Sequence, residues 1–105
     1  MSGPDLYIIH GPLYKRNRKG LFSKATVLRD VELVASSPEL RIRKKPGDAK
    51  YKRIWLAGVT AHAAWQTGRF CYLALSAPAN RLLAARSRAE RDAWIQAINN
   101  CPQSQ

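Results

Sequence analysis

The chain is poor in cysteine and in acidic residues, and it lacks a long hydrophobic run. Its two cysteines, Cys71 and Cys101, are too few for a disulfide framework and lack the spacing of a zinc site, so we predict reduced thiols and no metal. The longest apolar stretches, such as residues 70–79, reach about half the length of a bilayer-spanning helix, which argues against a transmembrane segment. The N-terminal Met-Ser-Gly-Pro-Asp does not resemble a secretory signal, so we expect a cytosolic or nuclear setting.

Acidic residues are heavily outnumbered by basic ones. The 105 residues include 18 Lys and Arg against 7 Asp and Glu, a net charge of +11, and 46% of them are hydrophobic. Residues 1–53 hold 13 of the basic and 5 of the acidic residues, which gives +8 there and +3 (5 minus 2) in the remainder. One rim of the molecule should therefore attract phosphates, of lipid or nucleic acid. We expect one domain over residues 1–105, with its core at about 7–99, excised from a larger protein.

Two-residue hydrophobic alternation dominates the first 85 positions and predicts an antiparallel sheet. In the third strand, Leu40 and Ile42 should lie on one face and Arg41 and Arg43 on the other. Turn signals divide the pattern into seven strands, at residues 6–16, 25–35, 40–45, 53–57, 59–65, 70–75 and 81–85.

The pattern changes to a helical period near the C-terminus. Ser87 and Glu90 have the spacing of a capping box, and Ala93, Trp94 and Ile98 belong to an apolar stripe within a helix at 89–99. Trp94 should therefore be buried in the core. The predicted fold is mainly β: a seven-stranded, partly open antiparallel barrel or orthogonal sandwich, with one C-terminal helix closing one end.

Three segments resemble the pleckstrin homology (PH) family. Gly11-Pro12-Leu13-Tyr14-Lys15 is similar to its first-strand G-x-L-x-K motif, and Ile54-Trp55-Leu56-Ala57-Gly58 to its fourth-strand I-x-L-x-G motif. Residues 85–98, with Trp94, resemble the closing helix of the family, and the resemblance extends over about residues 7–99. It implies a module that binds phosphoinositide head groups at the open end of the barrel.

The family's basic signature, K-x(n)-[KR]-x-R, can be placed here in two ways. Lys15 matches the leading lysine, and its parity with Leu13 would point it into the mouth of the barrel. If the second strand begins at residue 25, the remaining positions hold Phe22-Ser23-Lys24. If the turn at Ser36-Ser37-Pro38 fixes the register, Arg29 takes the final basic position, and we favour this second alignment.

The segment 15–24 combines cations with a short apolar tip at Leu21 and Phe22. Each cation near an anionic bilayer contributes about 1 kcal/mol, and the tip would enter the interface. The alternative is a solvated hairpin in which Leu21 and Phe22 begin the next strand. A second basic group flanks the Pro46-Gly47 loop and includes Arg41, Arg43, Lys44, Lys45, Lys50, Lys52 and Arg53.

The resemblance places this second group beside the same mouth, where Lys15, Arg18, Arg29 and Arg43 would converge on a phosphate. The alternative is an outward-facing basic edge that opposes aggregation. Our candidate anion-binding residues are Lys15, Arg16, Arg18, Lys19, Lys24, Arg29, Arg41, Arg43 and Lys45.

Two tryptophans suggest a different function. Trp55 alternates with Ile54 and Leu56, so it should face outward, where tryptophan is a common contact anchor. The alternative function is therefore a protein-interaction module of a cytoskeletal or signalling protein, with weak or no specific lipid binding. For Trp65 we expect burial beneath a loop.

The sequence gives little support to catalysis. His10 and His62 have no Ser or Cys nearby with a carboxylate to orient them, and we expect Asp30 and Glu32 to be solvated. We therefore expect a non-enzyme without a cofactor, monomeric as an isolated domain, cytoplasmic and peripheral to the membrane. Nucleic acid is a less favoured partner, because the cation clusters contain almost no aromatic residues.

Overall fold

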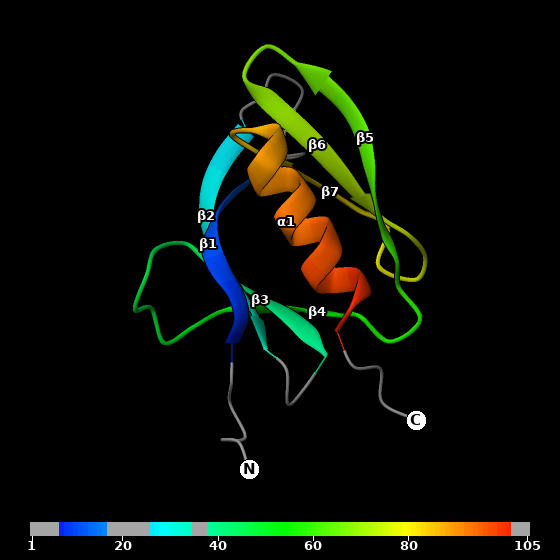
Figure 1. The fold of residues 1–105 in the computed structure, drawn as a ribbon. Coiled ribbons are helices and arrows are strands. Elements are labelled where there is room, and N and C mark those ends of the chain that lie inside the picture. The colour runs from blue at the N-terminus through cyan, green and yellow to red at the C-terminus, as the bar shows by residue number, and fades with distance from the viewer. Residues whose placement is uncertain (1–6, 17–25, 35–37, 102–105) are drawn as a thin grey trace.

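A computed structural model describes the backbone of residues 7–16, 26–34 and 38–101. Neighbouring strands pair antiparallel throughout. The described elements, drawn in Figure 1, are β1 (Tyr7–Arg16), β2 (Thr26–Val34), β3 (Glu39–Arg43), β4 (Lys52–Trp55), β5 (Ala61–Thr67), β6 (Phe70–Leu75), β7 (Arg81–Ala85) and α1 (Arg88–Asn99). The seven strands and the closing helix that the sequence predicts are confirmed.

The strands form one curved sheet in the order β4-β3-β2-β1-β7-β6-β5. β1 joins the two halves of the sheet, because it pairs with β2 along its length but with β7 only at Tyr14 and Lys15. β4 and β5 are the two edges, so the result is a half barrel, and α1 packs across β5, β6 and β7 (Figure 1). Among the described residues, no helix is long and apolar enough to cross a membrane.

The core lies on the inner face of this sheet. Leu40 and Ile42 are buried there, whereas Arg41 and Arg43 occupy the opposite face, as the alternation predicts. Trp94 is only 3% exposed and belongs to the same core, which confirms its predicted place. The largest fully buried apolar residues of the core are Leu13, Val31, Leu33, Leu40, Leu56, Leu73 and Ile98.

Side chains stabilise both ends of α1. At the N-terminus, the Ser87 hydroxyl accepts a hydrogen bond from the Glu90 backbone amide at 3.1 Å, and the Glu90 carboxylate pairs with Arg86 at 3.2 Å. At the C-terminus, the Asn99 side-chain amide donates to the Ala61 carbonyl at 2.9 Å, and its oxygen accepts from the Ala61 amide at 2.8 Å. Asn99 thus occupies the outer edge of β5 as a neighbouring strand would.

β5 departs from the prediction in both its bounds and its faces. It covers Ala61–Thr67 rather than 59–65, and its register against β6 shifts between Ala63 and Gln66. One extra residue on β5 reverses the alternation beyond it. The expected burial of Trp65 is therefore wrong: its side chain is 50% exposed, and its ring packs on Tyr72 with centroids 5.0 Å apart.

Both cysteines are buried thiols, and no disulfide joins them. Burial raises the pKa of the Cys101 thiol, because an apolar environment disfavours the charged thiolate. A thiol held neutral in this way is a weak nucleophile, so Cys101 belongs to the core rather than to a reactive site.

Candidate anion-binding pocket

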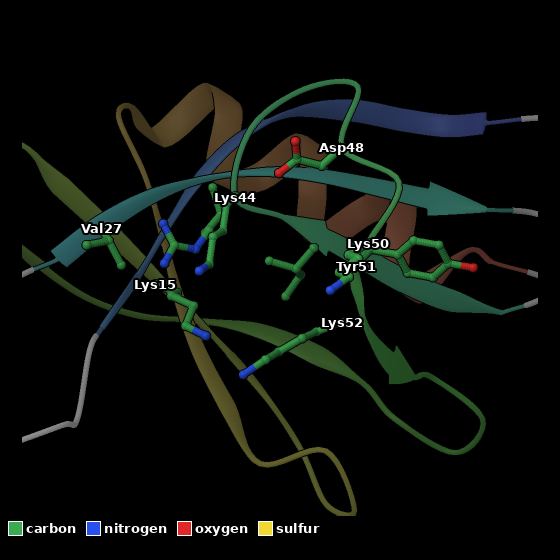
Figure 2. A pocket seen from close by; sticks show the side chains of 9 residues that line it. Lys15, Val27, Lys44, Asp48, Lys50, Tyr51 and Lys52 are labelled. Atoms are coloured by element: carbon green, nitrogen blue, oxygen red, sulfur yellow. The ribbon is translucent and has the colours of Figure 1, made fainter.

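A pocket of about 470 Å³ opens where β1 ends and β2 begins. Its lining brings together five cations and one carboxylate from β1, β2, β4 and the segment between β3 and β4. The lining residues are Lys15, Val27, Arg29, Ile42, Lys44, Asp48, Lys50, Tyr51 and Lys52. In Figure 2 the ammonium groups of Lys15 and Lys52 turn toward one another across the pocket, and the Tyr51 ring points away from them.

Strand alternation explains why these cations face inward. Lys15 lies two residues after the buried Leu13 of β1, and Arg29 lies two residues before the buried Val31 of β2. In the β1–β2 register, Leu13 pairs with Arg29. Lys15 and Arg29 therefore lie on adjacent strands. Lys15 thus lies along the pocket, as its parity with Leu13 predicts.

The β3–β4 hairpin contributes by the same rule. Lys44 follows the buried Ile42 by two residues, and Lys52 precedes the buried Ile54 by two. Lys52 is also the register partner of Ile42. These two lysines, with Lys50, line the pocket, although we did not select them as site residues from the sequence.

A tight turn shapes the loop that carries Lys44 and Lys50. The Asp48 amide donates to the Lys45 carbonyl at 3.2 Å, with Pro46 and Gly47 between them. Gly47 has a φ of +88°, a conformation that favours glycine, and proline followed by such a glycine is typical of a type II turn. The Pro46-Gly47 pair therefore fixes where the loop reverses.

On the opposite, outer face of the sheet, arginines neutralise two buried carboxylates. Arg43 pairs with Glu32 at 2.8 Å and Arg53 with Glu39 at 3.3 Å, and Arg41 lies near both carboxylates. The hydrogen bond to Glu39 raises the pKa of Arg41, because the carboxylate stabilises the charged guanidinium. Glu32 and Glu39 are 4% and 1% exposed, so these arginines keep buried charges paired.

The predicted site residues thus fall into three groups. Lys15 and Arg29 lie together in the pocket, whereas Arg41 and Arg43 lie on the outer face and Lys45 is an exposed turn residue outside the pocket lining. The expected convergence of Arg43 with Lys15 is therefore not what the structure shows. Arg18, Lys19, Lys24, Leu21 and Phe22 lie outside the described residues, as does the side chain of Arg16.

His10, Asp30 and Glu32 form a further polar group on the outer face. The His10 Nε2 atom lies 2.8 Å from Asp30 Oδ1, and one ligand atom from each of the three residues lies within 4.8 Å of the others. The prediction that Asp30 and Glu32 are solvated is wrong, because their side chains are only 10% and 5% exposed. These are atoms that could hold a metal. Glu32 Oε1 accepts a hydrogen bond from Arg43, whereas Glu32 Oε2 is buried without a hydrogen-bond partner among the described residues and has the Arg41 guanidinium 3.9 Å away.

Trp55 faces outward, as predicted, with 53% of its surface exposed. The Arg53 guanidinium carbon lies 5.6 Å from the centroid of its ring, within the range of a cation–π contact. Trp55 is thus an accessible aromatic on the edge strand β4, on the face opposite the pocket.

Comparisons with known proteins support the fold. No protein-family model matches the chain, and no curated protein matches it. The chain is similar to the crystal structure of the carboxyl-terminal PH domain of pleckstrin, at 20% identity and a TM-score of 0.76, over 92% of this chain and 97% of that one. It is similar to the solution structure of the C-terminal PH domain of human pleckstrin at the same identity and TM-score, over 96% of this chain and 85% of that one. The chain therefore has the PH fold that its motifs predict.

Proposed function

We propose that this domain is a non-catalytic module that binds anionic, phosphoinositide-bearing membranes through the pocket described above. The observation that carries the proposal is the uneven neutralisation of the basic residues. Arg29, Lys44, Lys50 and Lys52 form no ion pair with any residue that the structure describes, whereas Arg41, Arg43 and Arg53 are paired with buried carboxylates. Around β2, β3 and β4, the pocket side of the sheet therefore carries cations that are not neutralised, whereas the outer face is neutralised.

The chemistry of the pocket supports a phosphorylated ligand. With five cations and Asp48, its lining has a net charge of +4 (5 minus 1). Several ammonium groups and one guanidinium can each donate to a different phosphate oxygen, and the guanidinium can donate two parallel bonds. A volume of about 470 Å³ lies within the usual range of small-molecule sites.

Co-sedimentation with vesicles tests the proposal. We expect the domain to sediment with vesicles that contain phosphatidylserine and a phosphoinositide and to remain in solution with pure phosphatidylcholine. Lys44→Gln with Lys52→Gln should remove most of this binding, because each lost cation contributes about 1 kcal/mol near an anionic surface. Soluble inositol trisphosphate should compete if the head group enters the pocket, but not if the membrane surface alone is bound.

The matched control is Arg69→Gln with Arg81→Gln, which removes two exposed cations that do not line the pocket. Equal losses in the two double variants would show attraction by net charge alone and would overturn the proposed site. Equal sedimentation with neutral and anionic vesicles would overturn the membrane function itself.

A protein-interaction module is the second candidate function, and the exposure of Trp55 favours it. Trp55→Ala should leave vesicle binding unchanged, because Trp55 does not line the pocket. Loss of a protein partner in this variant, with vesicle binding intact, would support the second function. On the membrane proposal, the protein works at the cytoplasmic side of a membrane as a peripheral component.

A further inference from the structure

We infer that Arg43 is a positioning residue, not an anion ligand: it holds the 44–51 loop so that the loop lysines face Lys15 and Arg29. The Arg43 side chain is 15% exposed and forms three contacts on the outer face of the sheet. Its Nε donates to the Asp48 carbonyl at 2.8 Å, and its NH1 nitrogen donates to Glu32 Oε1 at 2.8 Å. Its guanidinium carbon lies 4.8 Å from the centroid of the Tyr51 ring.

These contacts join the loop to the interior of the sheet. Glu32 belongs to β2 and is 4% exposed, so it is a fixed anchor. Asp48 and Tyr51 belong to the loop, at its turn and near its end. A planar guanidinium can donate to the anchor and to the loop carbonyl at the same time, and it can stack on an aromatic ring while doing so.

The contacts of Arg43 on the outer face affect the lysines that line the pocket. Lys44 and Lys50 line the pocket from the segment that Arg43 fixes, and Lys52 follows immediately. Flexible lysines on a loose loop must be ordered when an anion binds, which weakens binding. Arg43 reduces this cost, and it does so without lining the pocket itself.

The inference rests on the proposed function for its binding readout, and its second readout is independent of any ligand. Hydrogen–deuterium exchange of residues 44–51 should be about tenfold faster in Arg43→Lys and Arg43→Gln, because the guanidinium bridge between the Glu32 anchor and the Asp48 carbonyl of the loop is lost. Exchange in β6 should not change, which separates a local role from general destabilisation. The matched control is Arg53→Gln, which removes the same charge from the same face, where Arg53 contacts Glu39 and Trp55.

Binding to phosphoinositide-bearing vesicles should fall about fivefold in Arg43→Lys and in Arg43→Gln alike, because an ammonium group lacks the two-pronged geometry of the guanidinium. Glu32→Ala should also weaken binding, because the anchor is removed. If Arg43 were instead a ligand, Arg43→Lys, which keeps the positive charge, would bind clearly more tightly than Arg43→Gln. Glu32→Ala, which removes a negative charge, would then bind the anionic vesicles more tightly.

Either of these last two results, or loop exchange unchanged in both Arg43 variants, would overturn the inference. Loop exchange equally fast in Arg53→Gln would overturn it as well. If the wild-type domain binds no anionic vesicle, the proposed function fails, while the exchange measurement still decides whether Arg43 holds the loop.

Discussion

Asp48 is the acidic member of a pocket whose other charged residues are Lys and Arg. Its backbone has a structural task, because its amide donates to the Lys45 carbonyl in the turn and its carbonyl accepts the hydrogen bond from Arg43. Its carboxylate, by contrast, opposes the entry of a phosphate. A negative charge among cations lowers the attraction for anions in general, so Asp48 limits how strongly the pocket attracts any polyanion.

Asp48→Asn should therefore bind phosphoinositide-bearing vesicles about threefold to fivefold more tightly than the wild type, because removing a like charge near the ligand is worth about 1 kcal/mol. The vesicle titration that measures this should include Asp92→Asn as a control. Asp92 is an exposed residue of α1 away from the pocket, and its substitution changes the net charge by the same amount. An equal gain in both variants would mean that total charge, not Asp48, sets the affinity.

Among the elements, α1 and β5 depend on each other through a single side chain. β5 is an edge strand, and the Ala61 amide and carbonyl would lack a strand partner on their outer side without Asn99. Asn99 satisfies both groups and fixes the end of the helix against the sheet. This link joins the last turn of α1 to the first residue of β5.

Asn99→Ala should lower the free energy of unfolding by about 1–2 kcal/mol, because it removes two hydrogen bonds to partly buried backbone groups. Urea denaturation followed by tryptophan fluorescence measures this change. Asn100→Ala is the matched control, because Asn100 follows directly and contributes its backbone amide to the helix end. If the two variants lose the same stability, the Asn99 bridge is not a significant part of the fold.

The strands and the helix also differ in how well the sequence predicts them. Strands with regular alternation were predictable, and β6 and β7 have the predicted bounds. The faces of β5 were not, because one inserted residue reverses parity and no local signal marks it. Asn99 was not predictable either, because its partner is 38 residues away.

The pocket was only partly predicted, although alternation contained more information than we used. Parity with Ile42 and Ile54 places Lys44 and Lys52 on the inner face, and the same rule places Arg43 on the outer face. The density of cations along the chain does not distinguish the two faces. What alternation cannot show is which cations are paired, since Arg43 and Glu32 are distant in sequence and meet only through the β2–β3 register.

At the scale of the whole molecule, a net charge of +11 has two components that respond differently to salt. Charges spread over the surface act on a membrane at a distance, and salt screens them. Cations that line a pocket act on a phosphate in direct contact, and salt screens such contacts less. The molecule should therefore bind acidic surfaces generally at low salt and phosphorylated head groups at high salt.

Sedimentation across a salt series separates these components. As the salt concentration rises from about 0.1 M to about 1 M, the screening length falls from about 10 Å to about 3 Å. We expect binding to vesicles with phosphatidylserine alone to disappear over this range, and binding to phosphoinositide-bearing vesicles to persist in part. The Lys44→Gln, Lys52→Gln variant should lose the binding that persists at high salt. It retains most of the distributed charge but lacks two of the cations that line the pocket. If the wild-type domain dissociates from both vesicle types at the same salt concentration, the pocket contributes nothing to binding beyond the distributed charge.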